Sequence, residues 1–509
     1  MKLWCALALA LLAAACGDEH PATAAAPANP APSPVAESFP RANVLLITID
    51  TVRADRLGCY GYARPTTPHL DALAKRSVLF EQAYSASSFT PPAHASILTG
   101  LYPAEHGLHY WNKSLADVPT AADTFAAAGY ATLAVTPLPT LLIIGLKRGF
   151  QNTASPDVGK VPNRDQLVIA DADAVNTAAL SYLLRKGDER PFFAWLHYYD
   201  AHRPYGRQGK EWSGRFAQDD NPSVGANEGW YQLTPELRST LGMDARRVQL
   251  MKDHYDGGLA FLDDRLGKLF DQLEHAGRLA NTIVLVVADH GECFDEHEPE
   301  WFAHDPYLYD QNVHVPLLLH LPGDAHAGLH VKDLVSQVDL LPTLLQLAGV
   351  APLDKQRFSG TSLVPALAGH SLQRSFVFAD RQGDDLSLPR EGQPPPTPEQ
   401  VVASRDRHQM LRTPTRKLLI GVDSGQAQLF DLSAPDGESH DLRESDPQGF
   451  KAAYEAYMSW EQSLRPPGDT GNVLTPEQQK YIESLGYTGG KSHAPPAPTD
   501  EKDKPKVPR

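Results

Sequence analysis

The chain has 509 residues and carries 46 Lys and Arg against 62 Asp and Glu, which gives a formal net charge of −16. Proteins that bind nucleic acid need a basic face for the phosphates, so this balance argues against nucleic acid as a partner. The length exceeds what one small core usually holds, and it predicts a large domain with a smaller one beside it.

The first segment of the chain predicts a lipoprotein signal peptide over residues 1–16. Its apolar run, Leu3–Ala15, is too short to span a bilayer as a helix. The run ends in Ala-Ala-Ala-Cys-Gly, which resembles the lipobox of bacterial lipoproteins, where the cysteine is acylated. We therefore expect a membrane anchor on Cys16 and a location in the bacterial cell envelope, lipid-anchored or periplasmic or extracellular. Ordinary cleavage after Ala-x-Ala is the alternative, and the choice of inner or outer membrane stays open.

Residues 17–40 are rich in alanine and proline. Such a composition favours extended chain and cannot bury a core. The segment is predicted to be a linker that tethers the folded part of the protein.

Short apolar runs predict strands that pair in parallel, because near-continuous hydrophobicity is typical of strands covered on both faces. These runs are residues 43–50, 131–135, 191–197, 282–289 and 315–320. Helical segments alternate with them at residues 68–76, 121–129 and 255–277. The alternation predicts an α/β fold with a doubly wound, mostly parallel sheet.

The chain changes character in its last third. Residues 416–422 and 428–432 predict strands of a smaller and more polar sheet, and residues 450–464 predict a helix. We expect a main domain over residues 41–375 and a smaller C-terminal α+β subdomain over residues 376–465. Residues 466–509 are expected to be a C-terminal segment and a disordered tail, because the last part is rich in Pro, Lys and Asp.

Two of the predicted strands end in acids, Asp50 and Asp289. Ligands of open α/β sheets collect beyond the carboxyl ends of the strands, so two acids there are typical of a metal site. A turn or helix cap is an equally good interpretation for either acid alone. The histidine that follows the second acid, His290, strengthens the metal-site interpretation.

Thr90 is predicted to lie at the N-terminus of a helix, because Pro91 favours the first helical turn. The helix dipole and the free N–H groups at such an end would favour an anionic ester. A simple helix-capping role for Thr90 is the alternative.

Five segments together resemble the active-site motifs of the sulfatase family, a branch of the alkaline phosphatase superfamily. They are residues 50–61, 90–100, 197–205, 288–292 and 302–309. In that family a Cys or Ser, followed by x-Pro-x-Arg, is oxidised to formylglycine, the nucleophile. Here Thr90 stands at the nucleophile position and His94 at the arginine position, and a threonine β-carbon would oxidise to a ketone instead. The chain is identified as a sulfatase variant with threonine at the formylglycine position, and residues 41–375 as its catalytic domain.

The resemblance implies one divalent metal ion, Ca²⁺, Mn²⁺ or Zn²⁺, held by Asp50, Thr90, Asp289 and His290. The family usually has two adjacent acids where this chain has Asp50 followed by Thr51. The lost carboxylate puts the usual calcium preference in doubt, because a site with imidazole favours Zn²⁺ or Mn²⁺.

The resemblance also implies catalytic roles for Thr90, His94, His202 and His304. His202 occupies the position of the histidine on the leaving side of the ester, and His304 that of a substrate-binding Lys or His. His304 is therefore expected to bind the ester oxygens or to protonate the leaving group.

Other polar residues of these segments are weaker candidates. His197 lies inside a predicted strand, where a core histidine is expected. The family's Gly-Lys-Trp-His segment is absent, and Lys113 and Lys147 are considered as substitutes, although each is more typical of a surface lysine. Glu292 belongs to a polar loop for which a solvated role is expected.

The expected function is hydrolysis of sulfate or phosphate esters by a metal-activated Thr90 nucleophile. The partner would be an anionic ester substrate, and the oligomeric state is open. Phosphate esters are favoured, because phosphothreonine is a known kind of intermediate in the superfamily's phosphodiesterases. The alternative is a catalytically inert sulfatase-like lipoprotein that binds anionic envelope or glycan ligands.

Overall fold

The computed structural model describes residues 38–160, 167–217, 243–297, 302–304, 307–382, 405–434, 437–467, 474–478 and 480. The predicted signal peptide, the linker up to residue 37 and the tail beyond residue 480 lie outside these ranges. Within them, no helix is both long enough and apolar enough to cross a membrane. Residues 37–509 cluster as one compact unit.

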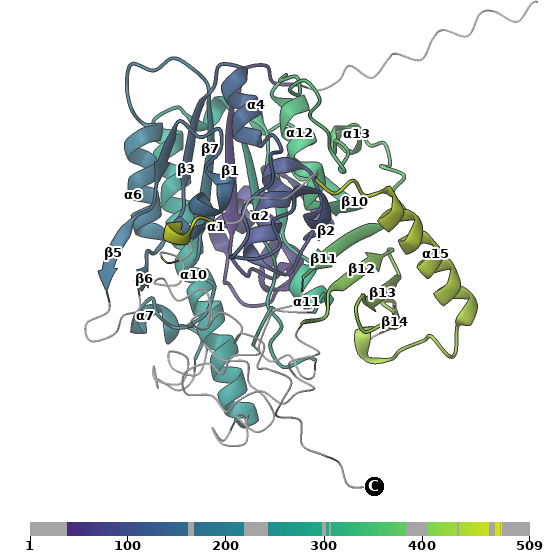
Figure 1. The fold of residues 1–509 in the computed structure, drawn as a ribbon. Coiled ribbons are helices and arrows are strands. Elements are labelled where there is room, and N and C mark those ends of the chain that lie inside the picture. Colours follow the sequence, from purple (N-terminus) through teal and green to yellow (C-terminus); the bar gives the residue numbers. More distant parts are fainter. Residues whose placement is uncertain are drawn as a thin grey trace, which may run out of the picture. The chain divides into compact units, whose positions relative to one another are not determined.

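The strands of the described residues form a main sheet of eight, in the order β10-β2-β9-β8-β1-β7-β3-β4 (Figure 1). From one edge to the other they are His330–Ser336, Val78–Tyr84, Leu317–His320, Thr282–Ala288, Asn43–Ile49, Phe192–Tyr198, Ala131–Val135 and Asn152–Ala154. Only β9 runs antiparallel to its neighbours among these described strands. The predicted α/β fold with a mostly parallel sheet is confirmed.

The direction of β9 corrects one expectation, since residues 315–320 were predicted to pair in parallel. β9 pairs antiparallel with β8, its predecessor in the main sheet, and with β2. A parallel neighbour needs a crossover that carries the chain back to the other end of the sheet, usually a helix of several turns. The described part of the connection holds only the four-residue helix α11, Asp310–Val313. The chain therefore re-enters the sheet at the end where β8 left it.

Helices flank the main sheet (Figure 1). Besides α11, the described α-helices before residue 447 are α1 Pro68–Ala74, α2 Thr90–Thr99, α3 Pro103–His106, α4 Ala121–Ala127, α5 Pro139–Leu141, α6 Ala172–Leu183, α7 Lys210–Ser213, α10 Ala245–His275, α12 Leu340–Leu347 and α13 Val364–Leu367. Helix α10 begins ten residues before the predicted start, where the Asp244 side chain accepts a hydrogen bond from Arg247 N–H. A further pair of short strands, β5 and β6, covers Asp157–Lys160 and Leu167–Ile169.

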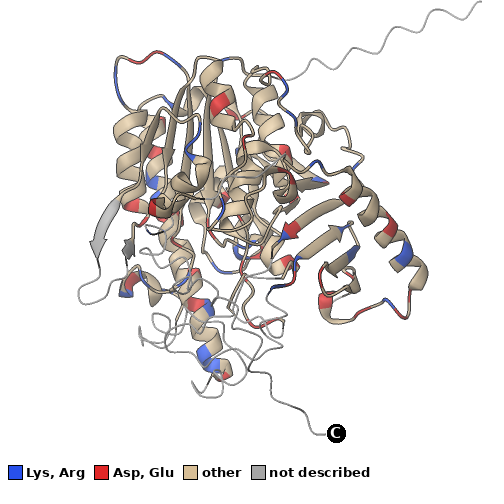
Figure 2. Ribbon diagram, in the orientation of Figure 1, with Lys and Arg blue, Asp and Glu red and all other residues tan. Residues whose placement is uncertain are grey.

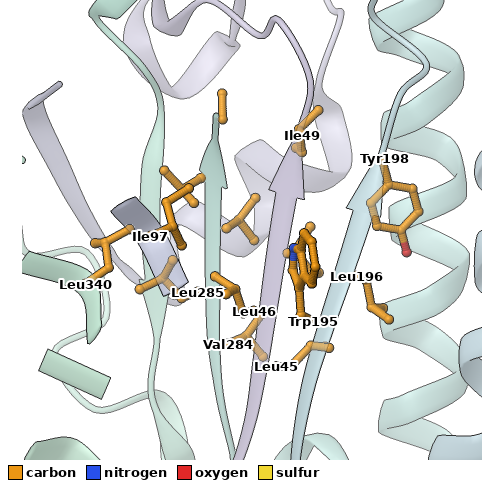
Figure 3. Close-up of a cluster of buried hydrophobic side chains, with 14 of the residues drawn as sticks. Leu45, Leu46, Ile49, Ile97, Trp195, Leu196, Tyr198, Val284, Leu285 and Leu340 are labelled. Carbon is orange, nitrogen blue, oxygen red and sulfur yellow. The ribbon is translucent and has the colours of Figure 1, made fainter. Parts of the chain in front are cut away.

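The core lies around the three central strands β7, β1 and β8, in which all residues but one are buried. Their apolar side chains pack with Ile97 of α2 and Leu340 of α12 (Figure 3). Charged residues are scarce on the strands of the main sheet and gather on helices and loops (Figure 2). A sheet buried on both faces explains why these strands show continuous rather than alternating hydrophobicity.

The C-terminal region contains a separate antiparallel sheet of four described strands in the order β11-β12-β13-β14. They are Val377–Arg381, His408–Arg412, Arg416–Gly421 and Gln426–Asp431, followed by helix α15, Pro447–Ser463. The strands predicted at residues 416–422 and 428–432 correspond to β13 and β14, and the helix predicted at residues 450–464 corresponds to α15. The smaller C-terminal sheet is confirmed, while its boundary at residue 376 stays a prediction.

One buried cation joins the small sheet to the main domain. Lys417 of β13 is fully buried, and its Nζ lies 2.9 Å from Asp310 Oδ1 and 2.7 Å from Glu438 Oε1. Asp310 also pairs with Arg412 of β12. These contacts place the start of α11, which follows the segment that carries His304, against the small sheet.

Candidate active site

The candidate site begins where the three central strands end. Ile49 pairs with Tyr198 on one side and with Ala288 on the other. The next residue, Asp50, donates its N–H to the Tyr198 carbonyl at 2.9 Å, and Asp289 donates its N–H to the Ile49 carbonyl at 3.1 Å. The backbone hydrogen bonds between these strands therefore place Asp50 and Asp289 side by side at the carboxyl edge of the sheet.

Asp50, Asp289 and His290 form a cluster whose donor atoms lie within 4.8 Å of one another, and all three residues are buried. Asp289 Oδ1 accepts hydrogen bonds from the N–H groups of His290 and Thr51, at 2.7 and 3.2 Å. Its Oδ2 and both carboxylate oxygens of Asp50 have no hydrogen-bond partner among the described residues. Unpaired buried carboxylates are costly, so this donor set fits a divalent cation.

The electrostatics of the two acids agree with a cation site. Burial raises the pKa of Asp50 well above its usual range, and the negative charge of Glu292 adds to that shift. Burial likewise raises the pKa of Asp289, and Asp50 adds to it. Two carboxylates cannot stay ionised together in such a place unless positive charge compensates them.

Thr90 is the first residue of helix α2, and Phe89 is the capping residue. The Thr90 side chain makes no capping bond; its Oγ1 lies 3.2 Å from Nε2 of His290. His290 Nδ1 donates to the Gly291 carbonyl at 2.9 Å, which leaves Nε2 of the neutral ring as the acceptor for the Thr90 hydroxyl. The hydroxyl therefore faces the acidic cluster, as the nucleophile interpretation requires, and does not cap its helix.

The helix end offers fewer backbone donors than the sequence suggested. Residues 91 and 92 are both prolines, which have no N–H group. The Ala93 N–H is already bonded to the Phe89 carbonyl at 3.1 Å. Anion binding here depends on side chains more than on the helix N-terminus.

His304 and His202 lie together beside the cluster. The His304 ring centroid is 4.5 Å from that of His290 and 5.2 Å from that of His202. His304 Nδ1 donates to Glu292 Oε1 at 3.0 Å, and His202 Nδ1 donates to the Arg203 carbonyl at 2.7 Å. In the neutral rings Nε2 is therefore the free acceptor of both histidines.

Glu292 is a site residue for which the sequence predicted only a solvated loop. It is fully buried, and its Oε2 accepts a hydrogen bond from the Tyr205 hydroxyl at 2.8 Å.

Burial lowers the pKa of His304 well below its usual range, with contributions from Arg203 and Arg381. Burial and the neighbouring His304 do the same to the pKa of His202. The lowered pKa values keep both imidazole rings neutral at pH 7, so each can accept a proton.

His94 and His197 lie on the inner side of the site and are fully buried. His94 Nδ1 donates to the backbone carbonyl of Thr90 at 2.8 Å, so it touches the predicted nucleophile through the main chain. His197 is a buried strand histidine as predicted, but its Nε2 also lies 3.4 Å from Asp50 Oδ2. The structure thus connects His197 to the metal-ligand candidates.

The cations near the site are arginines rather than the two proposed lysines. Lys113 and Lys147 are both exposed. The Arg203 side chain is 14% exposed, and its Nε lies 3.9 Å from Glu292 Oε2. Arg381 of β11 is fully buried, with its guanidinium 4.2 Å above the Phe89 ring. Arg203 lies directly after His202, inside the motif of residues 197–205, and its role was missed there; Arg381 comes from a distant segment that no sequence signal marked.

Residues 42–350 match the family model described as Sulfatase. An ulvan-active sulfatase of Formosa agariphila is 27% identical over 345 residues, covering 60% of this chain and 62% of that protein. An arylsulfatase of Clostridium perfringens is 25% identical over 467 residues, covering 79% of this chain and 90% of that protein. The chain thus spans less than two thirds of the first of these relatives and most of the second.

Solved structures share the fold at low sequence identity. The phosphonate monoester hydrolase of Agrobacterium radiobacter superposes with a TM-score of 0.64 at 21% identity, covering 83% of this chain and 96% of that one. A protein solved in complex with its substrate D-glucosamine-2-N,6-O-disulfate superposes with a TM-score of 0.65 at 19% identity, covering 84% and 100%.

Proposed function

The chain belongs to the sulfatase family, and we propose that it is a metal-dependent hydrolase of sulfate or phosphate esters with Thr90 as its nucleophile. The observation that carries the proposal is the contact between Thr90 Oγ1 and His290 Nε2, at 3.2 Å, beside the buried carboxylates of Asp50 and Asp289, three of whose oxygens have no hydrogen-bond partner among the described residues. A hydroxyl placed there is aimed at a charged centre. A helix-capping threonine would be aimed at its own backbone.

Asp50, Asp289 and His290, with the Thr90 hydroxyl, would hold one divalent cation. When bound, the cation would lower the pKa of a ligated hydroxyl and screen the charge of an anionic ester. Two carboxylates and an imidazole suit Zn²⁺ or Mn²⁺ as well as Ca²⁺, so the identity of the ion is for the binding experiment to decide.

In the proposed reaction the neutral Nε2 of His202 or His304 takes the hydroxyl proton of Thr90, and Thr90 Oγ1 attacks the sulfur or phosphorus atom and displaces the alcohol. The same Nε2 then gives that proton to the leaving oxygen. An anionic ester opposes the effect of Arg203 and Arg381 on His304, and so favours its protonated form. The same Nε2, once neutral, accepts the proton of the water that hydrolyses the sulfo- or phosphothreonine.

The nucleophile decides which ester is favoured. Formylglycine releases its sulfate through a geminal hydroxyl, whereas a threonine ester has to be hydrolysed by water. Among the structural relatives are a phosphonate monoester hydrolase and a protein whose substrate is a disulfated sugar, so the fold accommodates both chemistries. We favour phosphate esters, because phosphothreonine is a known kind of intermediate in the superfamily's phosphodiesterases and is released by water.

The proposal is tested by assaying purified protein with aryl phosphate, phosphodiester and aryl sulfate substrates in Ca²⁺, Mn²⁺ and Zn²⁺. Thr90→Val keeps the shape of the side chain and removes the hydroxyl, and we expect it to lower kcat by at least about 10³-fold. Thr90→Ser is the matched control that keeps a hydroxyl and should retain measurable turnover. Substrate-dependent modification of the peptide containing Thr90, read by mass spectrometry, would identify the covalent intermediate.

Turnover that survives Thr90→Val would remove Thr90 from the mechanism. Absence of turnover with every ester, together with tight binding of phosphate or sulfate, would instead favour the alternative function, an inert protein that binds anionic ligands.

A further inference from the structure

Behind the candidate metal ligands lies a polar network that the reaction above does not use. It consists of Thr48, His94, Trp195 and His197, and none of these residues has any solvent exposure. Three of them come from the central strands β1 and β7, and His94 comes from helix α2. Polar groups at such depth cost free energy unless their hydrogen bonds are made, so their partners indicate why they are there.

The contacts converge on one hydroxyl. Thr48 Oγ1 accepts from Trp195 Nε1–H at 2.9 Å, and it lies 3.0 Å from both His94 Nε2 and His197 Nδ1. The two ring nitrogens are themselves 3.1 Å apart. The rings meet edge to face, with centroids 4.4 Å apart.

The two ends of the network reach two different parts of the candidate site. His94 Nδ1 has the Thr90 carbonyl at 2.8 Å, and a carbonyl can only accept, so Nδ1 carries the proton. His197 Nε2 lies 3.4 Å from Asp50 Oδ2 without a hydrogen bond between them, and the negative charge of the carboxylate favours the proton on this nitrogen. The network thus joins the backbone of the nucleophile residue to a metal-ligand candidate 40 residues earlier in the chain.

The proton count makes Thr48 the central member. With protons on His94 Nδ1 and His197 Nε2, the two remaining ring nitrogens are both acceptors, and they face each other. The Thr48 hydroxyl proton is the donor that both of them share. Without it, two nitrogen lone pairs would lie 3.1 Å apart with nothing between them.

We propose that Thr48 and His197 are positioning residues of the metal centre: with His94 they fix the Asp50 carboxylate relative to the first turn of α2, which carries Thr90. This inference rests on the proposed function, because it assumes that Asp50 binds a metal ion. Partners that orient metal-binding carboxylates and imidazoles commonly change metal affinity by about 10–100-fold when they are removed.

The test is metal binding by the purified full-length protein after chelator treatment, measured by titration calorimetry with Mn²⁺ and Zn²⁺. Thr48→Val keeps the shape of the side chain and removes the shared proton, and we expect it to weaken binding by about 10–100-fold. Thr48→Ser keeps the hydroxyl and should stay within about threefold of the wild type, well below the range of about 10–100-fold for such effects. A role in packing alone predicts that the serine variant, which loses a methyl group, is the worse of the two.

His197 is tested in the same way. His197→Leu removes the imidazole that faces Asp50 and should weaken metal binding, while His197→Gln can still present an amide N–H to Asp50 and should recover most of the affinity. Metal affinity equal to that of the wild type in folded Thr48→Val and His197→Leu variants would overturn the inference. Should both variants fail to fold, histidine tautomers in ¹⁵N-labelled wild type decide: Nδ1–H for His94 and Nε2–H for His197 support it, and the opposite pair overturns it.

The failure of this inference can be told from the failure of the proposed function. If Asp50→Asn abolishes metal binding while the Thr48 and His197 variants bind normally, only the positioning role is wrong. A wild-type protein that binds neither Mn²⁺, Zn²⁺ nor Ca²⁺ would overturn both.

Discussion

At the scale of single residues, the site is organised by which atom of each side chain is already occupied. His290, His202 and His304 each use Nδ1 in a hydrogen bond to a carbonyl or a carboxylate, which leaves Nε2 for the site. Asp289 uses one oxygen for two backbone N–H groups and presents the other. Each functional atom is therefore the one left over after local structure has been satisfied.

Asp200, just beyond β7, gives a pH-dependent prediction. Burial raises its pKa to about 6, although Arg207 opposes the shift. Because the folded-state pKa lies above the unfolded value of about 3.9, the stabilising contribution is full below that value and is lost as pH rises through about 6. Between pH 5 and pH 8 the wild type should lose about 1.4 kcal/mol of stability from this group, while Asp200→Asn, which cannot ionise, should not.

Chemical denaturation of wild type and Asp200→Asn at both pH values measures this difference. The constant offset caused by losing the Arg207 contact cancels when the two pH values are compared. Parallel pH profiles for the two proteins would show that Asp200 does not titrate in this range.

The residues that sequence could predict are those whose role follows from their place on a strand or motif. Asp50, Asp289 and His290 stand directly after buried strands, and the structure brings them together. Glu292, His197 and the arginines could not be predicted in the same way. Their roles depend on side-chain direction and on contacts with residues of other segments, such as that of Glu292 with Tyr205, 87 residues earlier, which no local pattern records.

At the scale of secondary-structure elements, the strongly apolar strands of the main sheet were predictable, whereas its mixed strands β2 and β10 were not. β2, with Glu81 and Gln82 in its middle, and β10, with Lys332 and Asp333, lack a continuous apolar run and escaped prediction. The reversed direction of β9 was equally hidden, because strand direction depends on the connection and not on the strand's own sequence.

The attachment of the small sheet gives a prediction at this scale. Lys417→Met leaves the buried Glu438 carboxylate without its cation, while the partly exposed Asp310 keeps Arg412, and breaking a buried pair costs about 3–5 kcal/mol. We expect a lower unfolding midpoint in urea and faster proteolysis within residues 377–431. Arg416→Met, one residue away, is the matched control: the Arg416 side chain is 36% exposed, and its loss should cost less than about 1 kcal/mol. Equal effects of the two changes would contradict the role of Lys417.

At the scale of the whole molecule, the predicted anchor is separable from the folded unit. Residues 37–509 cluster as one compact unit, and the core described above begins at Ala42. We propose that Cys16 carries a lipid that holds the protein in the cell envelope.

Cys16→Ser should therefore move the protein from the membrane fraction to the soluble fraction of cells, without changing activity per molecule. Fractionation with immunodetection, and metabolic labelling with a fatty acid, measure the two parts of this prediction. A Cys16→Ser variant that stays with membranes would show that the protein is held by something other than this lipid.

The placement of β1 between β7 and β8 has a consequence for the order in which the protein matures. Asp50 is made early, but its neighbour Asp289 comes 239 residues later, and the Thr51 N–H that orients Asp289 bridges 238 residues. Contacts so far apart in the chain form slowly, because the intervening loop must first be closed. The candidate metal ligands therefore meet only once β8 has been inserted beside β1. Metal binding would then occur only after β8, the last of the three central strands to be synthesised, has folded into the main sheet.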